Sequence, residues 1–333
     1  MMETGKLPPE ILTRLLSRTR TDPSVIIGPA YGEDAAAVRF GGKVLVGAAD
    51  PITFATDRVG YYAVSVNAND IAVLGAIPRY FLATILLPEG STESEAESVF
   101  NEIEDACRVI DVTLIGGHTE ITPTVSRIVV SGCMLGEADE NRLVRTSGAR
   151  VGDAVLLVGG IAIEGASILA REAKSDLLAR GVDEAVIERA RGYLDDPGSC
   201  VLRYARIAME IGGVTAMHDP TEGGLATALR ELAAASGKGI RIDRASIPVL
   251  PECNDICRAL GIDPLGLIAS GSLLIAVEPG SVEAMMQAFE LAGMQVRCIG
   301  SVTCEDEGIR FDDGTAFPSF ERDEIARYFD EPN

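Results

Sequence analysis

The residues of this chain best suited to metal binding or catalysis are acids placed where an apolar core is expected. Asp70 is the only charged residue between Ala63 and Ala76, a segment of small and apolar side chains that also contains Asn67 and Asn69. A buried carboxylate is costly, so Asp70 requires a cation, a metal ion or several hydrogen-bond donors. Asn67 shares the face of the predicted helix, and both asparagines offer further oxygen ligands. The structural alternative is that Asp70 caps a neighbouring segment.

Two more acids lie at the edges of predicted elements. Asp50 directly follows Val44–Ala49, an apolar run of strand length, and ligand groups concentrate at the carboxyl ends of strands in α/β proteins. Asp34 lies in a Gly-Glu-Asp-Ala-Ala turn whose small residues allow a phosphate or another backbone to approach. Each acid alone is more typical of a turn or a cap. Together, Asp34, Asp50 and Asp70 form a set of hard oxygen ligands that suits Mg²⁺.

Glycine-rich turns supply candidates for phosphate binding. Gly116-Gly-His-Thr-Glu120 is predicted to be a loop between the strands Val112–Ile115 and Ile128–Met134, and Gly159-Gly160 follows another strand. Asp219-Pro-Thr-Glu-Gly-Gly224 links a strand to a helix, which Asp219 or Thr221 can cap while the helix amides face an anion. The candidates for cofactor contacts in these turns are Gly116, Gly117, Thr119, Thr221 and Gly223.

The chain has only two histidines, His118 and His218, and both lie in or beside these turns. A single histidine is usually structural, but this coincidence makes both rings of functional interest, and we take His118 and Asp219 as the candidate catalytic residues. No Gly-x4-Gly-Lys-Ser/Thr and no Gly-x-Gly-x-x-Gly pattern occurs, so the P-loop and Rossmann nucleotide folds lose support.

Alternating helices and strands position these residues, which predicts two α+β domains with mixed sheets. The pattern breaks near Ser147–Gly152, so we predict domains at 1–148 and 149–333. In the first domain, helices are predicted at 9–17, 60–76 and 93–110, with a further strand at 81–87. In the second domain, helices are predicted near 162–173, 183–194, 200–211, 222–235, 251–260 and 281–293. Its strands are predicted near 153–158, 214–218, 239–243, 272–277, 296–302 and 309–312.

Composition narrows the function classes. The 29 basic and 50 acidic residues give a net charge of −21, which opposes nucleic-acid binding, and no run of basic residues compensates for it. No apolar stretch approaches the roughly 20 residues of a membrane-spanning helix, and no secretory signal is visible. Seven scattered cysteines without a Cys-x-x-Cys motif are typical of buried, reduced thiols. We therefore expect a cytoplasmic protein without nucleic-acid or membrane partners.

Taken in order, these motifs resemble the aminoimidazole ribonucleotide (AIR) synthase superfamily, also called PurM-like. The resemblance covers about residues 28–305 and includes Asn69-Asp-Ile-Ala-Val-Leu-Gly-Ala-Ile-Pro78, Gly152-Asp153 and Asp219-Pro-Thr-Glu-Gly-Gly-Leu225 besides the acids. The sequence is most similar to the HypE hydrogenase maturation proteins, which share Asp-Pro-Thr-x-Gly-Gly-Leu and a counterpart of Ile262-Asp-Pro-Leu265.

The resemblance implies an N-terminal mixed-sheet domain that forms a homodimer and a C-terminal ferredoxin-like α/β domain. It implies ATP as cofactor, with Mg²⁺ on the acids Asp34, Asp50 and Asp70. It also implies phosphorylation of a small-molecule substrate or its ATP-driven dehydration. The alternatives are a small-molecule kinase like thiamine-monophosphate kinase, or a non-catalytic nucleotide-binding factor that assists a partner in metalloenzyme maturation.

The sequence also departs from the HypE pattern. HypE works through a cysteine near its C-terminus, whereas no cysteine follows Cys304 here and the tail is Phe329-Asp-Glu-Pro-Asn333. HypE carries Glu-Gly-Lys where this chain has Ser270-Gly-Ser272, and Arg where it has Glu222. These differences leave the acceptor substrate open.

Overall fold

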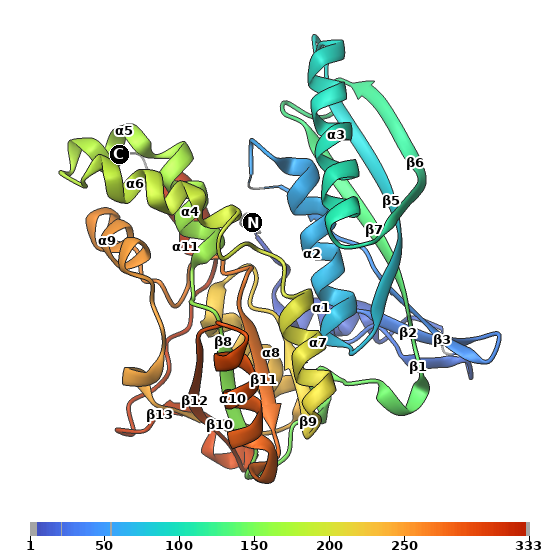
Figure 1. Cartoon of the computed structure of the whole chain (residues 1–333), viewed down its shortest axis with the longest axis vertical. Helices are drawn as coiled ribbons and strands as arrows, with labels where there is room; N and C mark the ends of the chain where they lie inside the picture. The colour runs from blue at the N-terminus through green and yellow to red at the C-terminus, as the bar shows by residue number, and fades with distance from the viewer. Residues whose placement is uncertain (1–4, 21, 54, 331–333) are drawn as a thin grey trace. The chain divides into compact units, whose positions relative to one another are not determined.

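The computed structural model describes residues 5–20, 22–53 and 55–330, which form two compact units (Figure 1). The N-terminal unit contains the described residues of 22–28 and 34–143, and the C-terminal unit contains those of 5–20, 29–33 and 144–330. No helix in the described part of the chain is long and apolar enough to cross a membrane.

The division into these two compact units differs from the domain boundary predicted at residue 148. The predicted domains, 1–148 and 149–333, therefore stay a prediction. Residues 5–20 and 29–33 belong to the C-terminal unit although they precede most of the N-terminal unit in sequence. Side-chain contacts over long sequence separations explain part of the difference. The Glu33 carboxylate accepts hydrogen bonds from the backbone N–H groups of Thr146 and Ser147, at 3.3 Å each.

The N-terminal unit is a seven-stranded mixed sheet with two helices. The strands follow the order β1-β2-β3-β7-β5-β6, β4 pairs with β7, and β5 and β6 are the parallel pair. Alternate residues of the strands, including Val46, Phe81 and Val130, are buried, and α2 packs against β5 and β7. The elements are β1 Val25–Ile27, β2 Ala36–Phe40, β3 Lys43–Ala48, β4 Pro51–Ile52, α2 Val59–Val73, β5 Ile77–Pro88, α3 Glu93–Val109, β6 Thr113–Thr122 and β7 Val129–Ala138.

Local sequence explains the helix boundaries in this unit. Gly75, at φ +71°, directly follows the C-cap of α2, in a conformation that glycine adopts without strain. A capping box starts α3: the Thr92 hydroxyl accepts from the Glu95 N–H, and the Glu95 carboxylate accepts from the Thr92 N–H.

The C-terminal unit contains a six-stranded sheet in the order β13-β10-β12-β8-β11-β9, in which β10 and β13 are parallel. Leu225, Leu229 and Leu232 of helix α8 pack with alternate strand residues in one core cluster. Strand β11 is buried along its whole length. The elements are α1 Pro9–Leu16, β8 Ala154–Val158, α4 Ile163–Glu172, α5 Lys174–Ala179, α6 Glu184–Arg191, α7 Leu202–Ile211, β9 Val214–His218, α8 Gly224–Ser236, β10 Gly239–Ile242, α9 Pro251–Leu260, β11 Leu273–Val277, α10 Val282–Leu291, β12 Val296–Thr303, β13 Ile309–Phe311 and α11 Glu324–Asp330.

The predicted α+β class is confirmed, and the predicted helices and strands agree with the structure to within a few residues at most ends. The short strands β1, β2 and β4 and the helices α5 and α11 were not predicted. Their hydrophobic patterns are too short to establish a period of two or 3.6 residues.

Candidate functional site

Helix α2 carries the buried polar side chains Ser65, Asn67, Asn69 and Asp70, and Asn67 fixes the end of β3. Asn67 and Asn69 are fully buried, and Asp70 is 5% exposed. The Asn67 Oδ1 atom accepts a hydrogen bond from the Asp50 N–H (2.9 Å), while its Nδ2 donates to the carbonyls of Asp50 (3.2 Å) and Ala63 (2.8 Å). These bonds tie the backbone of Asp50 to the helix that contains Asp70.

Strand register places the other two acids at one end of the same sheet. Ala36, the first residue of β2, pairs with Gly47 near the end of the antiparallel strand β3. Asp34 precedes this pair by two residues and Asp50 follows it by three, and both acids are partly exposed. The three predicted acids therefore belong to the N-terminal unit, two at one sheet end and one on the helix bonded to that end.

The predicted loop at 116–120 is wrong, because these residues lie in strand β6. The strand pairs in parallel with β5 without interruption from Leu82↔Gly116 to Pro88↔Thr122. Gly117 has φ +148°, and a Cβ atom there would lie 1.8 Å from the carbonyl oxygen of Ala83. Gly117 therefore allows close strand packing at this point rather than a turn.

The position of His118 follows from this correction. Its side chain is 63% exposed, and its Nε2 lies 3.1 Å from the Glu120 carboxylate two residues along the same strand. Most of β6 is exposed, including Gly116, Gly117 and Thr119. Strand β6 is an edge strand of the sheet. Within the described part of the N-terminal unit, its predicted site residues are therefore exposed to solvent.

The turn between β9 and α8 differs from its predicted capping. The N-cap residue of α8 is Gly223, at φ +81°, so neither Asp219 nor Thr221 caps this helix. Instead the Gly223 N–H donates to the carboxylate of Asp323 (2.5 Å), a residue 100 positions later in the sequence. Asp219 is 1% exposed. The Asp323 carboxylate therefore contacts the amide end of α8, where the sequence analysis predicted that an external anion would bind.

Asp323 also caps the last helix, because its Oδ1 accepts from the Ile325 N–H (2.8 Å). Burial raises the pKa of Asp323 to about 7, and the backbone donors of Ile325, Gly223 and Ile268 lower it only in part. The carboxyl group therefore changes charge near neutral pH while it holds two helix ends.

Besides Asp323, the sequence reasoning missed other buried acids in the C-terminal unit, including Glu231 and Glu164. Glu231 lies on the apolar helix α8, 6% exposed, and Glu164 lies in the first turn of α4, 5% exposed. Burial raises the pKa of Glu164, against the lowering influence of Ser270 and of the Arg171 charge. Glu164 stands in apolar surroundings in the sequence, which is the signal that singled out Asp70 and would have found it, whereas Glu231 directly follows Arg230.

All seven cysteines are free, and most are unsuited to reactivity. Burial raises the pKa of Cys107 and of Cys257 to about 12, which keeps both thiols protonated at neutral pH. Cys298 and Cys304 are exposed, contrary to the expectation of buried thiols. Both lie at or just after β12, in the sheet of the C-terminal unit.

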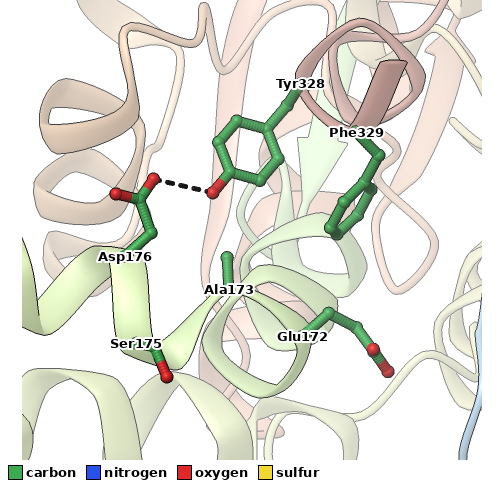
Figure 2. Close-up of a pocket in the computed structure, with 6 residues that line it drawn as sticks. All are labelled: Glu172, Ala173, Ser175, Asp176, Tyr328 and Phe329. Carbon is green, nitrogen blue, oxygen red and sulfur yellow. Dashed lines mark hydrogen bonds between the residues drawn. The ribbon is translucent and has the colours of Figure 1, made fainter. Parts of the chain in front are cut away.

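The end of the described chain is held against the C-terminal unit. Figure 2 shows Tyr328 and Phe329 of α11 beside the junction of α4 and α5, where they line a pocket of about 250 Å³ with Glu172, Ala173, Ser175 and Asp176. The Tyr328 hydroxyl donates to the Asp176 carboxylate (2.8 Å). The Glu324 carboxylate accepts from the Asp263 N–H (3.1 Å). The rest of the predicted cysteine-free tail, residues 331–333, lies outside the described residues.

The structure contains two mixed α+β units, with buried carboxylates near the ends of strands and helices. Comparison with known proteins identifies the family to which the chain belongs. Residues 32–138 match the family "AIR synthase related protein, N-terminal domain", and residues 150–313 match "AIR synthase related protein, C-terminal domain". The chain belongs to the AIR synthase related family.

Relatives within this family are named for hydrogenase maturation. A hydrogenase expression/formation protein of Methanocaldococcus jannaschii is 30% identical over 315 residues, covering 92% of this chain and 90% of the relative. The carbamoyl dehydratase HypE of Rhizobium leguminosarum bv. viciae is 30% identical over 264 residues, covering 77% of this chain and 71% of the relative.

Solved structures share the two-sheet fold. A crystal structure of the hydrogenase maturation protein HypE in complex with ATP has a TM-score of 0.70 at 25% identity, covering 88% of this chain and 90% of that one. A thiamine monophosphate kinase from Aquifex aeolicus has a TM-score of 0.68 at 22% identity, covering 86% of this chain and 93% of that one, which shows likeness of fold alone. The predicted family and fold are therefore confirmed.

Proposed function

We propose that the protein is an ATP- and Mg²⁺-dependent enzyme that phosphorylates or dehydrates a small substrate, in the manner of the HypE branch of its family. The observation that carries the proposal is the buried Asp70 on α2, the helix whose Asn67 is hydrogen-bonded to the strand end where Asp50 and Asp34 lie. Carboxylate oxygens are the donors Mg²⁺ prefers, so this set fits that ion. The ATP complex of a related HypE supports the choice of nucleotide.

Each residue has a role in this proposal. Asp34, Asp50 and Asp70 would hold the magnesium ion, which neutralises phosphate charge when it is bound. Asn67 keeps the backbone of Asp50 in place through two hydrogen bonds. Asn69 is a further candidate for cofactor contacts on α2. In the C-terminal unit, Asp219 remains the candidate catalytic acid or base, and Thr221 and Gly223 remain candidates for nucleotide contacts. His118, Gly116, Gly117 and Thr119 remain candidates on the edge strand β6.

The experiment that tests this proposal is ATP turnover with Mg²⁺ against a panel of metabolites, with each product identified by mass spectrometry. We expect ADP release to depend on one acceptor class. Although a relative is named carbamoyl dehydratase, we expect no ADP release that depends on a carbamoyl compound. A matched variant, Asp70→Asn, should abolish the dependence on the acceptor. If no acceptor raises ADP release above the Asp70→Asn background, the enzymatic proposal fails.

A non-catalytic factor in metalloenzyme maturation is the second candidate. It is favoured by the cysteine-free C-terminal region and by Ser270, which stands where HypE proteins carry a glutamate. Co-purification of a maturation partner with an unchanged ATP pool would favour this candidate over the enzyme. The free state of all seven cysteines supports a cytoplasmic location for either function.

We expect no thiocyanate adduct on any cysteine after incubation with a carbamoyl donor, its transferase and ATP. Formation of a thiocyanate needs a mobile, ionisable thiol, whereas Cys298 and Cys304 lie at a strand and the buried thiols stay protonated. Peptide mass mapping decides the result. A mass gain equal to a cyano group replacing hydrogen, on Cys304 in particular, would contradict this expectation.

We also propose that the protein is a homodimer formed through the sheet of the N-terminal unit. Strand residues facing away from the buried layer are partly exposed apolar groups, such as Leu82 and Leu135, and Tyr80, which pairs with Leu135, is 49% exposed. A second copy would cover this apolar face, as the family resemblance implies.

Light scattering at micromolar concentration should give about 70 kDa, twice the chain mass of 35.1 kDa. Replacing Tyr80 with Lys should shift the protein toward monomer, because a charge would be buried in the interface. Replacing Phe40, which is 71% exposed at the end of β2, with Lys is the matched control and should leave the mass unchanged. A parent protein at 35 kDa would refute the dimer.

A further inference from the structure

One end of the sheet in the C-terminal unit carries a buried carboxyl group that the proposed function does not use. Strand β11 pairs in antiparallel orientation with β8 on one side and with β9 on the other. The segments that follow β8 and β9 and the segment that precedes β11 therefore meet at the same end of the sheet. Glu164 lies in the first of these segments, Asp219 in the second and Ser270 in the third.

Close packing brings the first turn of helix α4, which contains Glu164, against the segment that contains Ser270. The N–H of Gly165 donates to the carbonyl oxygen of Ile268 (3.0 Å). A Cβ atom at Gly165 would overlap the side chain of Leu267, so only glycine permits this approach. Ser270 lies beside the carboxyl group of Glu164, close enough to lower its pKa against the effect of burial.

Both side chains of this pair are buried with a polar atom that has no hydrogen-bond partner. Glu164 is 5% exposed and Ser270 is 1% exposed. The Oε2 atom of Glu164 and the Oγ atom of Ser270 make no hydrogen bond to any residue that the structure describes. Buried polar atoms without partners destabilise a folded protein, so such atoms are typical of positions that bind a further polar group. Two of them side by side indicate a binding position.

The Glu164–Ser270 pair is connected to the turn that contains the candidate nucleotide contact Thr221. The N–H of Ala269, the residue before Ser270, donates to the carbonyl oxygen of Thr221 (3.3 Å). Asp219, the candidate catalytic acid or base, lies two residues before Thr221 in the same turn. All of these residues belong to the C-terminal unit. A ligand held by the pair therefore lies at the same end of the sheet as this turn.

The charges around Glu164 favour a neutral ligand that can give up a proton. Burial raises the pKa of Glu164, and Ser270 and the Arg171 charge lower it only in part. The Arg171 guanidinium also donates to the Ser167 hydroxyl (2.7 Å). A carboxylate with a raised pKa is a stronger base than an ordinary glutamate, and it repels an anionic ligand. A neutral hydroxyl group fits both properties, because it can accept a hydrogen bond from Ser270 and donate one to Glu164.

We propose that Glu164 and Ser270 bind the hydroxyl group of an uncharged small alcohol, and that Glu164 removes its proton during phosphorylation. The O–H bond breaks as the oxygen bonds to the γ-phosphorus of ATP, and the proton passes to Glu164. The bond from the γ-phosphorus to the bridging oxygen breaks at the same time, and ADP leaves with its electron pair. This inference rests on the proposed function and narrows its acceptor to one chemical class.

The test measures ADP release by the full-length protein with ATP, Mg²⁺ and a panel of neutral alcohols from glycerol to hexoses. Each alcohol is paired with its carboxylate, such as glycerate for glycerol and gluconate for glucose. We expect an alcohol to raise ADP release by about ten-fold or more over its carboxylate, with a phosphate ester as the product. In the parent, the rate should fall at low pH, where Glu164 becomes protonated.

Variants separate the role of Glu164 from a structural one. Glu164→Gln should lower kcat by about 100-fold or more, leave KM little changed and abolish the loss of rate at low pH. Ser270→Ala should raise KM for the alcohol, because a hydrogen bond to its hydroxyl group is lost. Glu172→Gln is the matched control, because this exposed glutamate lies on the same helix and should leave the rate and its pH profile unchanged.

The possible outcomes distinguish this inference from the proposed function. ADP release that depends on an anionic acceptor, or that keeps its pH profile in Glu164→Gln, overturns the inference and leaves the ATP-dependent activity in place. Absence of acceptor-dependent ADP release in the parent overturns both. If Glu164→Gln does not fold, Ser270→Ala decides, because an unchanged KM for the alcohol overturns the inference.

Discussion

Replacing Asp70 with Asn should weaken binding of Mg²⁺–ATP by about ten-fold or more, equivalent to about 1.4 kcal/mol. The Asp70 side chain is buried, with 5% of its surface exposed. Asn has nearly the same shape but carries no negative charge to bind a cation. The change should be measured by calorimetry in the presence and absence of Mg²⁺. A loss of affinity confined to the magnesium-containing titration would identify the metal as the cause.

The control for this prediction is Asp105→Asn, on α3 of the same unit. Asp105 is exposed and forms an ion pair with Arg108 at the next turn of the helix, so its loss should leave nucleotide affinity unchanged. The circular dichroism of Asp70→Asn should match the parent, because the helix keeps its apolar packing. Equal affinities for parent and Asp70→Asn would end the metal role of Asp70.

The second large effect concerns stability. The carboxyl group of Asp323 has a pKa of about 7 in the folded protein against 3.8 ordinarily, because burial disfavours its charged form. The folded state thus binds this proton more tightly than the unfolded state. Its contribution to the free energy of unfolding is greatest below pH 4 and is lost as pH rises to about 7. Each unit of pKa difference is worth about 1.4 kcal/mol, so the loss is on the order of 4 kcal/mol.

Asp323→Asn should remove this pH dependence. Denaturant unfolding of the C-terminal unit at several pH values should give a difference between parent and variant that falls steadily from pH 4 to pH 8. Contributions from all other groups are common to both proteins and cancel. Asp313→Asn is the control, because Thr315 lowers the pKa of that exposed acid and reverses the sign of its effect. Parallel stability curves for parent and Asp323→Asn would contradict the prediction.

The sequence by itself determined the class of fold and the family. Helices such as α3 carry a full amphipathic period and a capping box, and strands such as β11 are continuous apolar runs, so local patterns suffice to locate them. It also singled out Asp70, because a lone charge in an apolar helix is visible without knowing the fold. The same signal marks Glu164, which stands between apolar and small residues.

Only the tertiary structure decided what these polar groups contact. The glycines at 116 and 117 belong to a strand because β5 pairs with them, and sequence alone cannot distinguish a tight turn from such close pairing. Asp323 meets the start of α8 across 100 residues, and Lys6 meets Glu231 across 225. Hydrogen bonds over such separations leave no periodic pattern in the sequence, because the two partners come close together only when the chain folds. The sequence therefore named Asp70 and Asp219, while only the fold showed that Asp323 caps two helix ends and that Glu231 meets His218 and Lys6.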